Sequence, residues 1–136
     1  MKNKYYTPEI EEFHVGFEYE RCDDGYNWIK DTYPRAAEHI RLKNLIPCTR
    51  VKYLDREDIE SLGFVCHATD ERVFHNKNGI IINTEWGSPV KQGITLAIVS
   101  PVFDESKRNI IQEHYLFNGT IKNKSELKKL LKQLGI

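Results

Sequence analysis

Residues 123–136 read NKSELKKLLKQLGI, and this stretch decides the fold class that the sequence predicts. Its leucines recur at the spacing of one helix face and form an apolar stripe. The stripe consists of Leu127, Leu130, Leu131 and Leu134. Asn123 or Ser125 can cap the start, and Glu126 stands three residues after Asn123, as in a capping box. Gly135 occupies the position of a left-handed C-terminal cap.

The predicted closing helix, residues 124–134, is too short to be stable alone. Its leucines must therefore pack on another element, and the upstream sequence predicts β-strands. From Phe64 onward the chain reads as an antiparallel meander, with strands expected at 64–69, 72–76, 80–86, 94–100 and 109–117. Asn76–Gly79 has the residues that turns with positive φ require. Asn118 and Gly119 are expected to turn the chain into the closing helix.

The first half of the chain gives weaker signals. Residues 12–20, EFHVGFEYE, alternate between apolar and polar side chains, which predicts a half-buried strand with a charged outer face. Residues 51–54 predict a short strand, and Asp55 then caps a helix at 55–63. Residues 34–46, PRAAEHIRLKNLI, predict either a helix opened by proline or a loop followed by an extended segment.

These elements together predict one α+β domain over residues 1–136. We expect an antiparallel sheet of about five or six strands, covered on one face by two or three helices.

The formal net charge is zero, but the charges are unevenly distributed. Residues 1–33 hold eight acidic and four basic side chains, whereas residues 107–136 hold seven basic and two acidic ones. This pattern is typical of two solvated faces of opposite sign, and it also suits an anionic partner or a head-to-tail contact. A neutral chain without a dense basic run is a poor candidate for strong binding to duplex nucleic acid.

The three cysteines Cys22, Cys48 and Cys66 are an odd number without paired spacing. The N-terminal sequence MKNKYYTPEIEE lacks the apolar region of a secretory leader. No run approaches the roughly 20 apolar residues of a membrane-spanning helix. We therefore expect thiols in a reducing, cytoplasmic compartment and no membrane partner.

Motifs for chemistry are scarce. Cys66 and His67 are adjacent on a predicted strand and point to opposite faces, so with His75 they make a poor metal site. The chain has no nucleotide-binding glycine motif and no serine hydrolase motif, and we expect neither metal nor cofactor. The strand predicted at 12–20 would carry a hydrolytic candidate on its polar face. It consists of His14, Glu18 and Glu20, and the alternative is an ordinary solvated face.

A binding site is better supported than a catalytic one, because aromatic and basic residues cluster twice. Rings beside cations can stack on a nucleobase and hold a phosphate. The predicted ligand-binding residues are Tyr26, Trp28, Lys30, Tyr33, Arg35, Trp86 and Lys91, with Arg50 and Lys52 as weaker additions. The alternative is that Trp28 and Trp86 cover a hydrophobic core.

Two further passages carry a resemblance. The opening YYTPEIEEFHVGFEYE, and the pairing of VKYLDREDIESLGF with the terminal IKNKSELKKLLKQLGI, resemble a family of small accessory proteins encoded by tailed bacteriophages and mobile elements of gut bacteria. The resemblance leaves residues 21–49 and 86–118 unmatched and carries no catalytic residue. It implies a phage protein acting in the bacterial host cytoplasm. It also implies either opposition to host defence, by sequestering a signalling nucleotide or blocking a defence protein, or a minor part in the virion or its assembly.

Three functions follow as hypotheses. The first is a non-enzymatic binder of a small anionic or nucleotide signal, which acts by occupancy. The second is a structural or assembly protein of the virion. The third is a small hydrolase that uses His14, Glu18 and Glu20. The expected partners are a small anionic ligand or a host protein, and exposed sheet edges make a homo-oligomer plausible.

Overall fold

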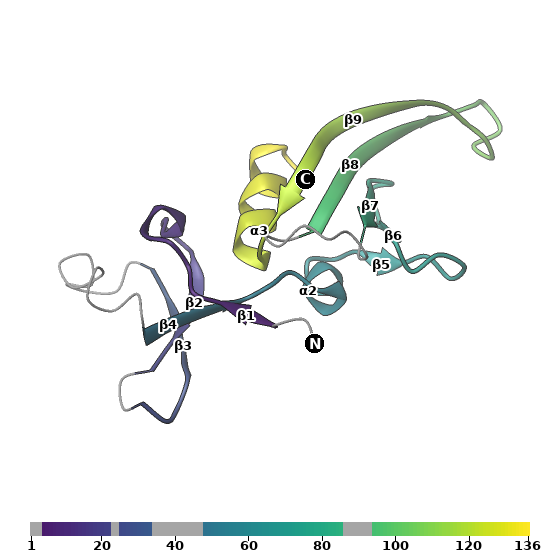
Figure 1. The fold of residues 1–136 in the computed structure, drawn as a ribbon. Helices are drawn as coiled ribbons and strands as arrows, with labels where there is room; N and C mark the ends of the chain where they lie inside the picture. The colour runs from purple at the N-terminus through teal and green to yellow at the C-terminus, as the bar shows by residue number, and fades with distance from the viewer. Residues whose placement is uncertain (1–3, 23–24, 34–47, 86–93) are drawn as a thin grey trace. The chain divides into compact units, whose positions relative to one another are not determined.

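The computed structural model describes residues 4–22, 25–33, 48–85 and 94–136 (Figure 1). The chain divides into two compact units, Met1–Tyr53 and Leu54–Ile136. The first contains an antiparallel sheet of four strands, and the second an antiparallel sheet of five strands with two described α-helices. The predicted α+β class is confirmed, with two sheets where one was expected. That residues 1–136 form one domain stays a prediction.

Unit 1 is a small sheet around an aromatic cluster. It contains β1 (Tyr5–Tyr6), the 3-10 helix η1 (Ile10–Glu12), β2 (Glu18–Arg21), β3 (Ile29–Thr32) and β4 (Thr49–Lys52). The strand order is β1-β4-β2-β3, and every described pair is antiparallel. The core consists of Phe17, Tyr19 and Val51, with Tyr6, Phe13 and Tyr33 packed against them. This packing leaves the other face of the sheet for polar side chains.

The strand predicted at 12–20 is wrong over its first six residues. Gly16 adopts φ 91°, which glycine tolerates and other residues avoid, and the Phe17 N–H donates to the His14 carbonyl over 2.9 Å. This turn interrupts the extended backbone, so β2 begins only at Glu18. The apolar residues of the alternating pattern still pack together, because the Phe13 ring lies edge-on to the Phe17 ring with 4.9 Å between the centroids.

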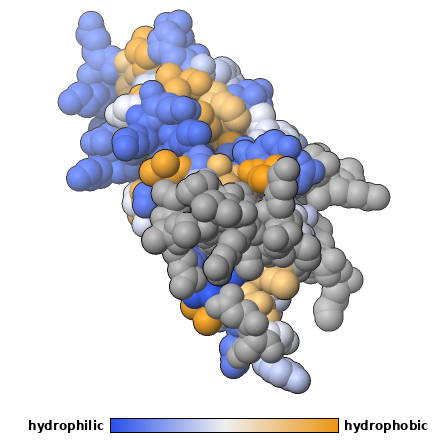
Figure 2. Space-filling view, turned by 90° about the vertical axis from the view of Figure 1, so that its left-hand side faces the viewer, coloured by the Kyte–Doolittle hydropathy of each residue, from blue (hydrophilic) through white to orange (hydrophobic). Residues whose placement is uncertain are grey.

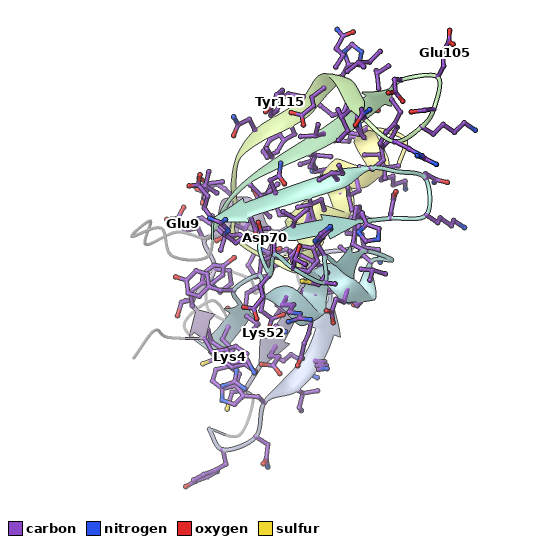
Figure 3. The ribbon with its side chains drawn as sticks, turned by 90° about the vertical axis from the view of Figure 1, so that its right-hand side faces the viewer. Lys4, Glu9, Lys52, Asp70, Glu105 and Tyr115 are labelled. Atoms are coloured by element: carbon purple, nitrogen blue, oxygen red, sulfur yellow. The ribbon has the colours of Figure 1, made fainter. Side chains whose placement is uncertain are left out.

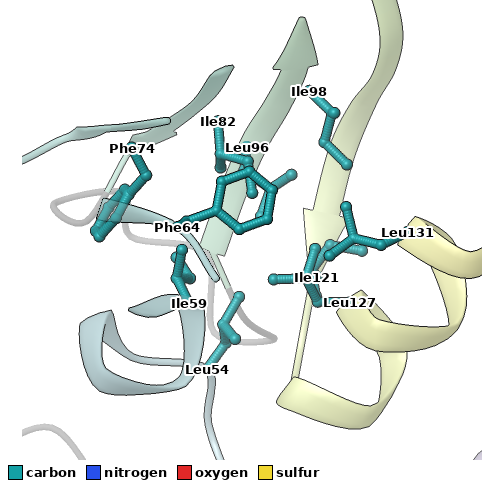
Figure 4. Packing of buried hydrophobic residues seen from close by; sticks show 10 residues of the cluster. All are labelled: Leu54, Ile59, Phe64, Phe74, Ile82, Leu96, Ile98, Ile121, Leu127 and Leu131. Atoms are coloured by element: carbon teal, nitrogen blue, oxygen red, sulfur yellow. The ribbon is translucent and has the colours of Figure 1, made fainter. Parts of the chain in front are cut away.

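Unit 2 is the predicted meander with helices on one face. Its elements are α2 (Arg56–Ser61), β5 (Val65–Cys66), β6 (Val73–His75), β7 (Ile81–Glu85), β8 (Ile94–Phe103), β9 (Ile110–Ile121) and α3 (Lys124–Gln133). The strands pair in chain order. Both helices pack against one core, which Figure 4 shows. Its buried members are Leu54, Ile59, Phe64, Phe74, Ile82, Leu96, Ile98, Ile121, Leu127 and Leu131.

The closing helix is confirmed together with both of its caps. Asn123 Oδ1 accepts the Glu126 N–H over 2.8 Å. At the C-terminus, Gly135 adopts φ 75° and the Ile136 N–H donates to the Leu131 carbonyl over 2.9 Å, which is the Schellman arrangement. Helix α2 is also confirmed, since Asp55 and Asp58 exchange side-chain and backbone hydrogen bonds at its start.

Two other expectations have different outcomes. Asn118 and Gly119 do not turn the chain, because β9 continues to Ile121 and Gly119 pairs with Leu96. The Phe117 ring packs over Gly119, and a Cβ at this position would lie 2.9 Å from that ring. Glycine is therefore favoured here because it leaves room for the ring. The helix considered for residues 34–46 lies outside the described residues.

The hairpin formed by β8 and β9 extends past the rest of its sheet. The last recorded β7–β8 pair is Ile81 with Val99, whereas β8 and β9 stay paired as far as Phe103 and Ile110. Residues 100–114 therefore form a two-stranded projection, which we call the arm (Figure 1). Figure 3 shows Glu105 in the loop at its end.

Candidate functional site

One face of the unit 1 sheet brings cations and aromatic rings together. Residues directly opposite one another in antiparallel strands share a face. The recorded pairs are Tyr5 with Lys52, Glu20 with Arg50, and Glu20 with Lys30. We call this surface, together with Trp28, the Arg50 face. It lies opposite the side that carries the buried Tyr19 and Val51.

The Arg50 guanidinium lies between two aromatic rings. Its central carbon is 3.8 Å from the centroid of the Tyr5 ring and 4.2 Å from that of the Trp28 ring. Both distances are within the range of cation–π attraction. Two rings on one guanidinium restrict its rotamers, so the side chain is held in place before any ligand arrives.

Glu20 occupies only part of the hydrogen-bonding capacity of Arg50. The Arg50 Nε donates to Glu20 Oε2 over 2.7 Å, and the two side chains keep 27% and 19% of their exposure. Within the part of the chain that the structure describes, no acceptor is recorded for the two terminal Nη groups of Arg50. A guanidinium has five N–H donors in a planar fork, so this arrangement leaves its outer edge for an anion.

The predicted ligand-binding residues separate into three groups. Trp28 and Lys30 lie on the Arg50 face, and Tyr26, 89% exposed, precedes them in the chain. Tyr33 instead packs against the aromatic core, with its ring 5.7 Å from that of Phe13. The other predicted members, Arg35, Trp86 and Lys91, lie outside the described residues.

The predicted acid–base residues are only partly brought together. Glu18 and Glu20 alternate along β2 and share a face, as expected. His14 is not on that strand, and its Nδ1 lies 3.0 Å from the Glu12 carbonyl oxygen. The Glu20 carboxylate forms an ion pair with Arg50, so Glu20 is already engaged on this face.

Sequence reasoning missed Tyr5 and gave Arg50 too little weight. Tyr5 stands 45 residues before Arg50, and the strand order that places β1 beside β4 cannot be read from local periodicity. One signal was present in the sequence: residues 49–52, TRVK, alternate, with the cations Arg50 and Lys52 on either side of Val51; in the structure Thr49 and Val51 are buried and the two cations half-buried. That alternation marks the polar face on which Arg50 lies.

The β8–β9 hairpin, which includes the arm, carries the second notable surface. Five large apolar side chains on the β8–β9 hairpin are exposed: Phe103, Ile110, Ile111, Tyr115 and Leu116. Figure 2 shows one face of the molecule, on which hydrophobic areas appear among hydrophilic ones. Tyr115 is labelled on β9 in Figure 3. Large apolar residues grouped at an exposed position often mark a contact surface.

Asp104 organises the loop at the end of the arm. Its carboxylate accepts hydrogen bonds from the Ser106 hydroxyl over 2.6 Å and from the Asn109 side-chain amide over 3.0 Å. These hydrogen bonds stabilise the charged carboxylate and lower the pKa of Asp104 to about 2, with the largest effect from the Ser106 hydroxyl. The loop also contains Lys107 at φ 59°, a backbone conformation that is uncommon for a residue other than glycine.

Other kinds of site find no support in the described ranges. They contain no group of three or more histidine, cysteine or acidic residues placed to hold a metal ion. No helix among them has the length and apolar character that crossing a bilayer demands. Comparison of the chain with protein-family models, with curated proteins and with solved structures found no match.

Proposed function

We propose that this chain is a non-catalytic binding protein whose Arg50 face takes a small anionic ligand with an aromatic part, such as a nucleotide. The observation that carries the proposal is the guanidinium of Arg50, held between Tyr5 and Trp28 with its Nη groups directed at no recorded acceptor in the described residues. Preorganised donors of this kind bind phosphate through charge-assisted hydrogen bonds.

The neighbouring side chains support the two halves of such a ligand. Trp28 is 40% exposed, so part of its indole remains for stacking on a base. Lys30 lies opposite Glu20 on the same face and adds a second cation to that face, one strand beyond Glu20. Glu20 holds the Nε side of the guanidinium, which fixes the orientation of the remaining donors.

Binding without turnover fits the context that the sequence resemblance implies. A phage accessory protein that sequesters a host signalling nucleotide in the bacterial cytoplasm needs occupancy and no catalytic base. The hydrolase hypothesis is less favoured, because His14 contacts the Glu12 main chain and Glu20 is paired with Arg50.

The test is a binding measurement on purified protein with cyclic dinucleotides, ADP-ribose and inorganic phosphate. We expect a nucleotide to raise the melting temperature. Arg50→Lys should weaken the affinity about tenfold to a hundredfold, because a lysine replaces the fork with a point charge. Mass spectrometry should recover the ligand intact.

The chain supplies a matched control in Arg21. The Arg21 Nε donates to Asp31 Oδ2 over 2.9 Å on the same small sheet, and Arg21 follows Glu20 directly on β2, so it lies on the face opposite to Glu20 and Arg50. Arg21→Lys should leave the affinity unchanged. The proposal is overturned if no nucleotide shifts the melting temperature, or if Arg50→Lys binds like the parent protein.

A second function, a structural or assembly role, is favoured by the arm. In its sheet β9 is the last strand of the recorded order, so its outer edge has no recorded strand partner in the described residues. An antiparallel edge is self-complementary about a two-fold axis, and β9 contains no lysine, arginine or proline to oppose such pairing. We therefore propose a second copy of this chain as the partner of β9.

Light scattering on the purified chain tests the assembly role. Ile111, 66% exposed on β9, should be required for self-association, so Ile111→Lys should give a monomer. Val65 on the opposite edge strand is 61% exposed and provides the control, since Val65→Lys should leave the oligomer intact. A parent chain that is monomeric at high concentration would rule the role out.

A further inference from the structure

We infer that Cys22 and Cys48 are a redox-active pair that forms a disulfide across the ends of β2 and β4. The recorded register pairs Glu20 with Arg50 and Arg21 with Thr49. Extending it by one residue places Cys22 opposite Cys48, and the Cys22 N–H donates to the Cys48 carbonyl over 2.8 Å. The two cysteines therefore lie beside each other, one residue beyond the paired ends of β2 and β4, although 25 other residues separate them in the sequence.

The spacing of such neighbours suits a disulfide. Opposite residues in a hydrogen-bonded antiparallel pair have Cα atoms about 5.5 Å apart, and disulfides span Cα distances of roughly 4.4 to 6.8 Å. Their Cβ atoms, typically about 4.5 to 5.5 Å apart, must approach by up to about 1 Å to reach the disulfide range. A bond that needs such an adjustment is more easily reduced, which favours a reversible modification.

Position in the fold, and not exposure alone, distinguishes this pair from the third cysteine, because Cys22 and Cys66 are both half-buried. Cys48 is exposed, so an oxidant can reach its thiol, and the half-buried Cys22 lies beside it. Cys66 belongs to unit 2, pairs with Phe74 across β5 and β6, and packs against the large core. Cys66 therefore serves as an internal reference thiol.

The proposed reaction uses a peroxide as the oxidant. The Cys48 thiolate attacks one peroxide oxygen, the O–O bond breaks, and a sulfenic acid forms as one water leaves. The Cys22 sulfur then attacks the Cys48 sulfur, the S–S bond forms, and the sulfenic oxygen leaves as a second water. In total two thiols lose two protons and two electrons, and one hydrogen peroxide is reduced to two waters.

The bond would close a covalent loop that contains all of β3. It would also fix the register of β2 and β4 close to the Glu20–Arg50 pair, because Cys22 stands only two residues after Glu20 in the chain. Restricting the unfolded chain in this way should stabilise unit 1. The inference depends on the cysteine pairing alone and holds whether or not the Arg50 face binds a nucleotide.

The experiment treats the full chain with hydrogen peroxide, blocks remaining thiols with an alkylating agent, and maps disulfides by mass spectrometry without reduction. We expect a peptide that joins Cys22 to Cys48, Cys66 still alkylated, and reversal by dithiothreitol. The oxidised protein should melt at a higher temperature than the reduced one. Cys66→Ser should preserve the link and the shift, whereas Cys22→Ser should abolish both.

Three results would overturn the inference. One is a Cys48 that links only to a second copy of the chain. Another is a Cys22 thiol that stays reduced after peroxide treatment, and is therefore fully alkylated, while Cys48 is oxidised to sulfinic acid. The third is a link with the same yield in chains first unfolded in urea, because the folded strand register would then play no part.

Discussion

Truncating Leu127 to alanine should strongly destabilise unit 2. Leu127 is 0% exposed and packs in the core beneath the sheet. The substitution removes three carbon groups at about 0.8 kcal/mol each, or about 2.4 kcal/mol of transfer free energy. The cavity left behind adds to that cost, so we expect a loss of about 3 to 4 kcal/mol in the free energy of unfolding.

Native-state hydrogen exchange measures this loss within unit 2. The amides of Leu96 and Ile98 lie on β8, which has paired strands on both sides. If exchange follows opening of this core, a loss of about 3 kcal/mol should speed it by about two orders of magnitude. Fluorescence or circular dichroism of the whole chain would instead combine the unfolding signals of both units.

Two variants on the same helix act as controls. Lys128 is exposed, so Lys128→Ala should change the exchange rates little. Leu130 is only partly buried against the core, and Leu130→Ala should give an intermediate effect. A cost of less than about 1 kcal/mol for Leu127→Ala, or one no larger than that of Lys128→Ala, would contradict the role of Leu127 in this core.

Two further predictions concern single side chains. Asn123→Ala should lower the stability of unit 2 by about 1 kcal/mol in the same exchange measurement, because the Glu126 N–H loses its cap; an unchanged rate would contradict the capping role. Asp104 has a folded pKa lowered to about 2 from 3.8, so its contribution to loop order is full above pH 3.8 and is lost as the pH falls toward 2. Nuclear magnetic resonance of the Arg108 and Asn109 amides should follow this titration, and Asp104→Asn should remove it; amide shifts unaffected across that range would disprove the assignment.

The sequence predicted those parts of the fold in which local signals and burial agree. In the closing helix, the leucine spacing, the Asn123 cap and the Gly135 terminator all point to the same structure, and the structure has all three. The Asn76–Gly79 turn is a similar case, since Gly79 adopts φ 81° and the Gly79 N–H donates to the Asn76 carbonyl. Here the residue type determines the backbone conformation directly.

Local patterns failed where a single backbone conformation or a distant pairing decided the outcome. The alternation of residues 12–20 is genuine, yet Gly16 turns the chain, and an alternating pattern does not reveal the sign of φ. For the candidate site, Trp28 and Lys30 could be chosen by proximity in the sequence. Arg50 and Tyr5 came together through the strand order, which depends on the packing of the whole sheet.

The division of the chain after Tyr53 has a consequence for how such a protein can evolve. Strand β4 ends at Lys52 and the cap of α2 is Asp55, so the junction is only two residues long. Leu54 already belongs to the second core, and its N–H donates to the Lys122 carbonyl. Recombination at the Tyr53–Leu54 peptide bond would therefore transfer either unit together with its own hydrophobic core, and the Arg50 face would move with unit 1.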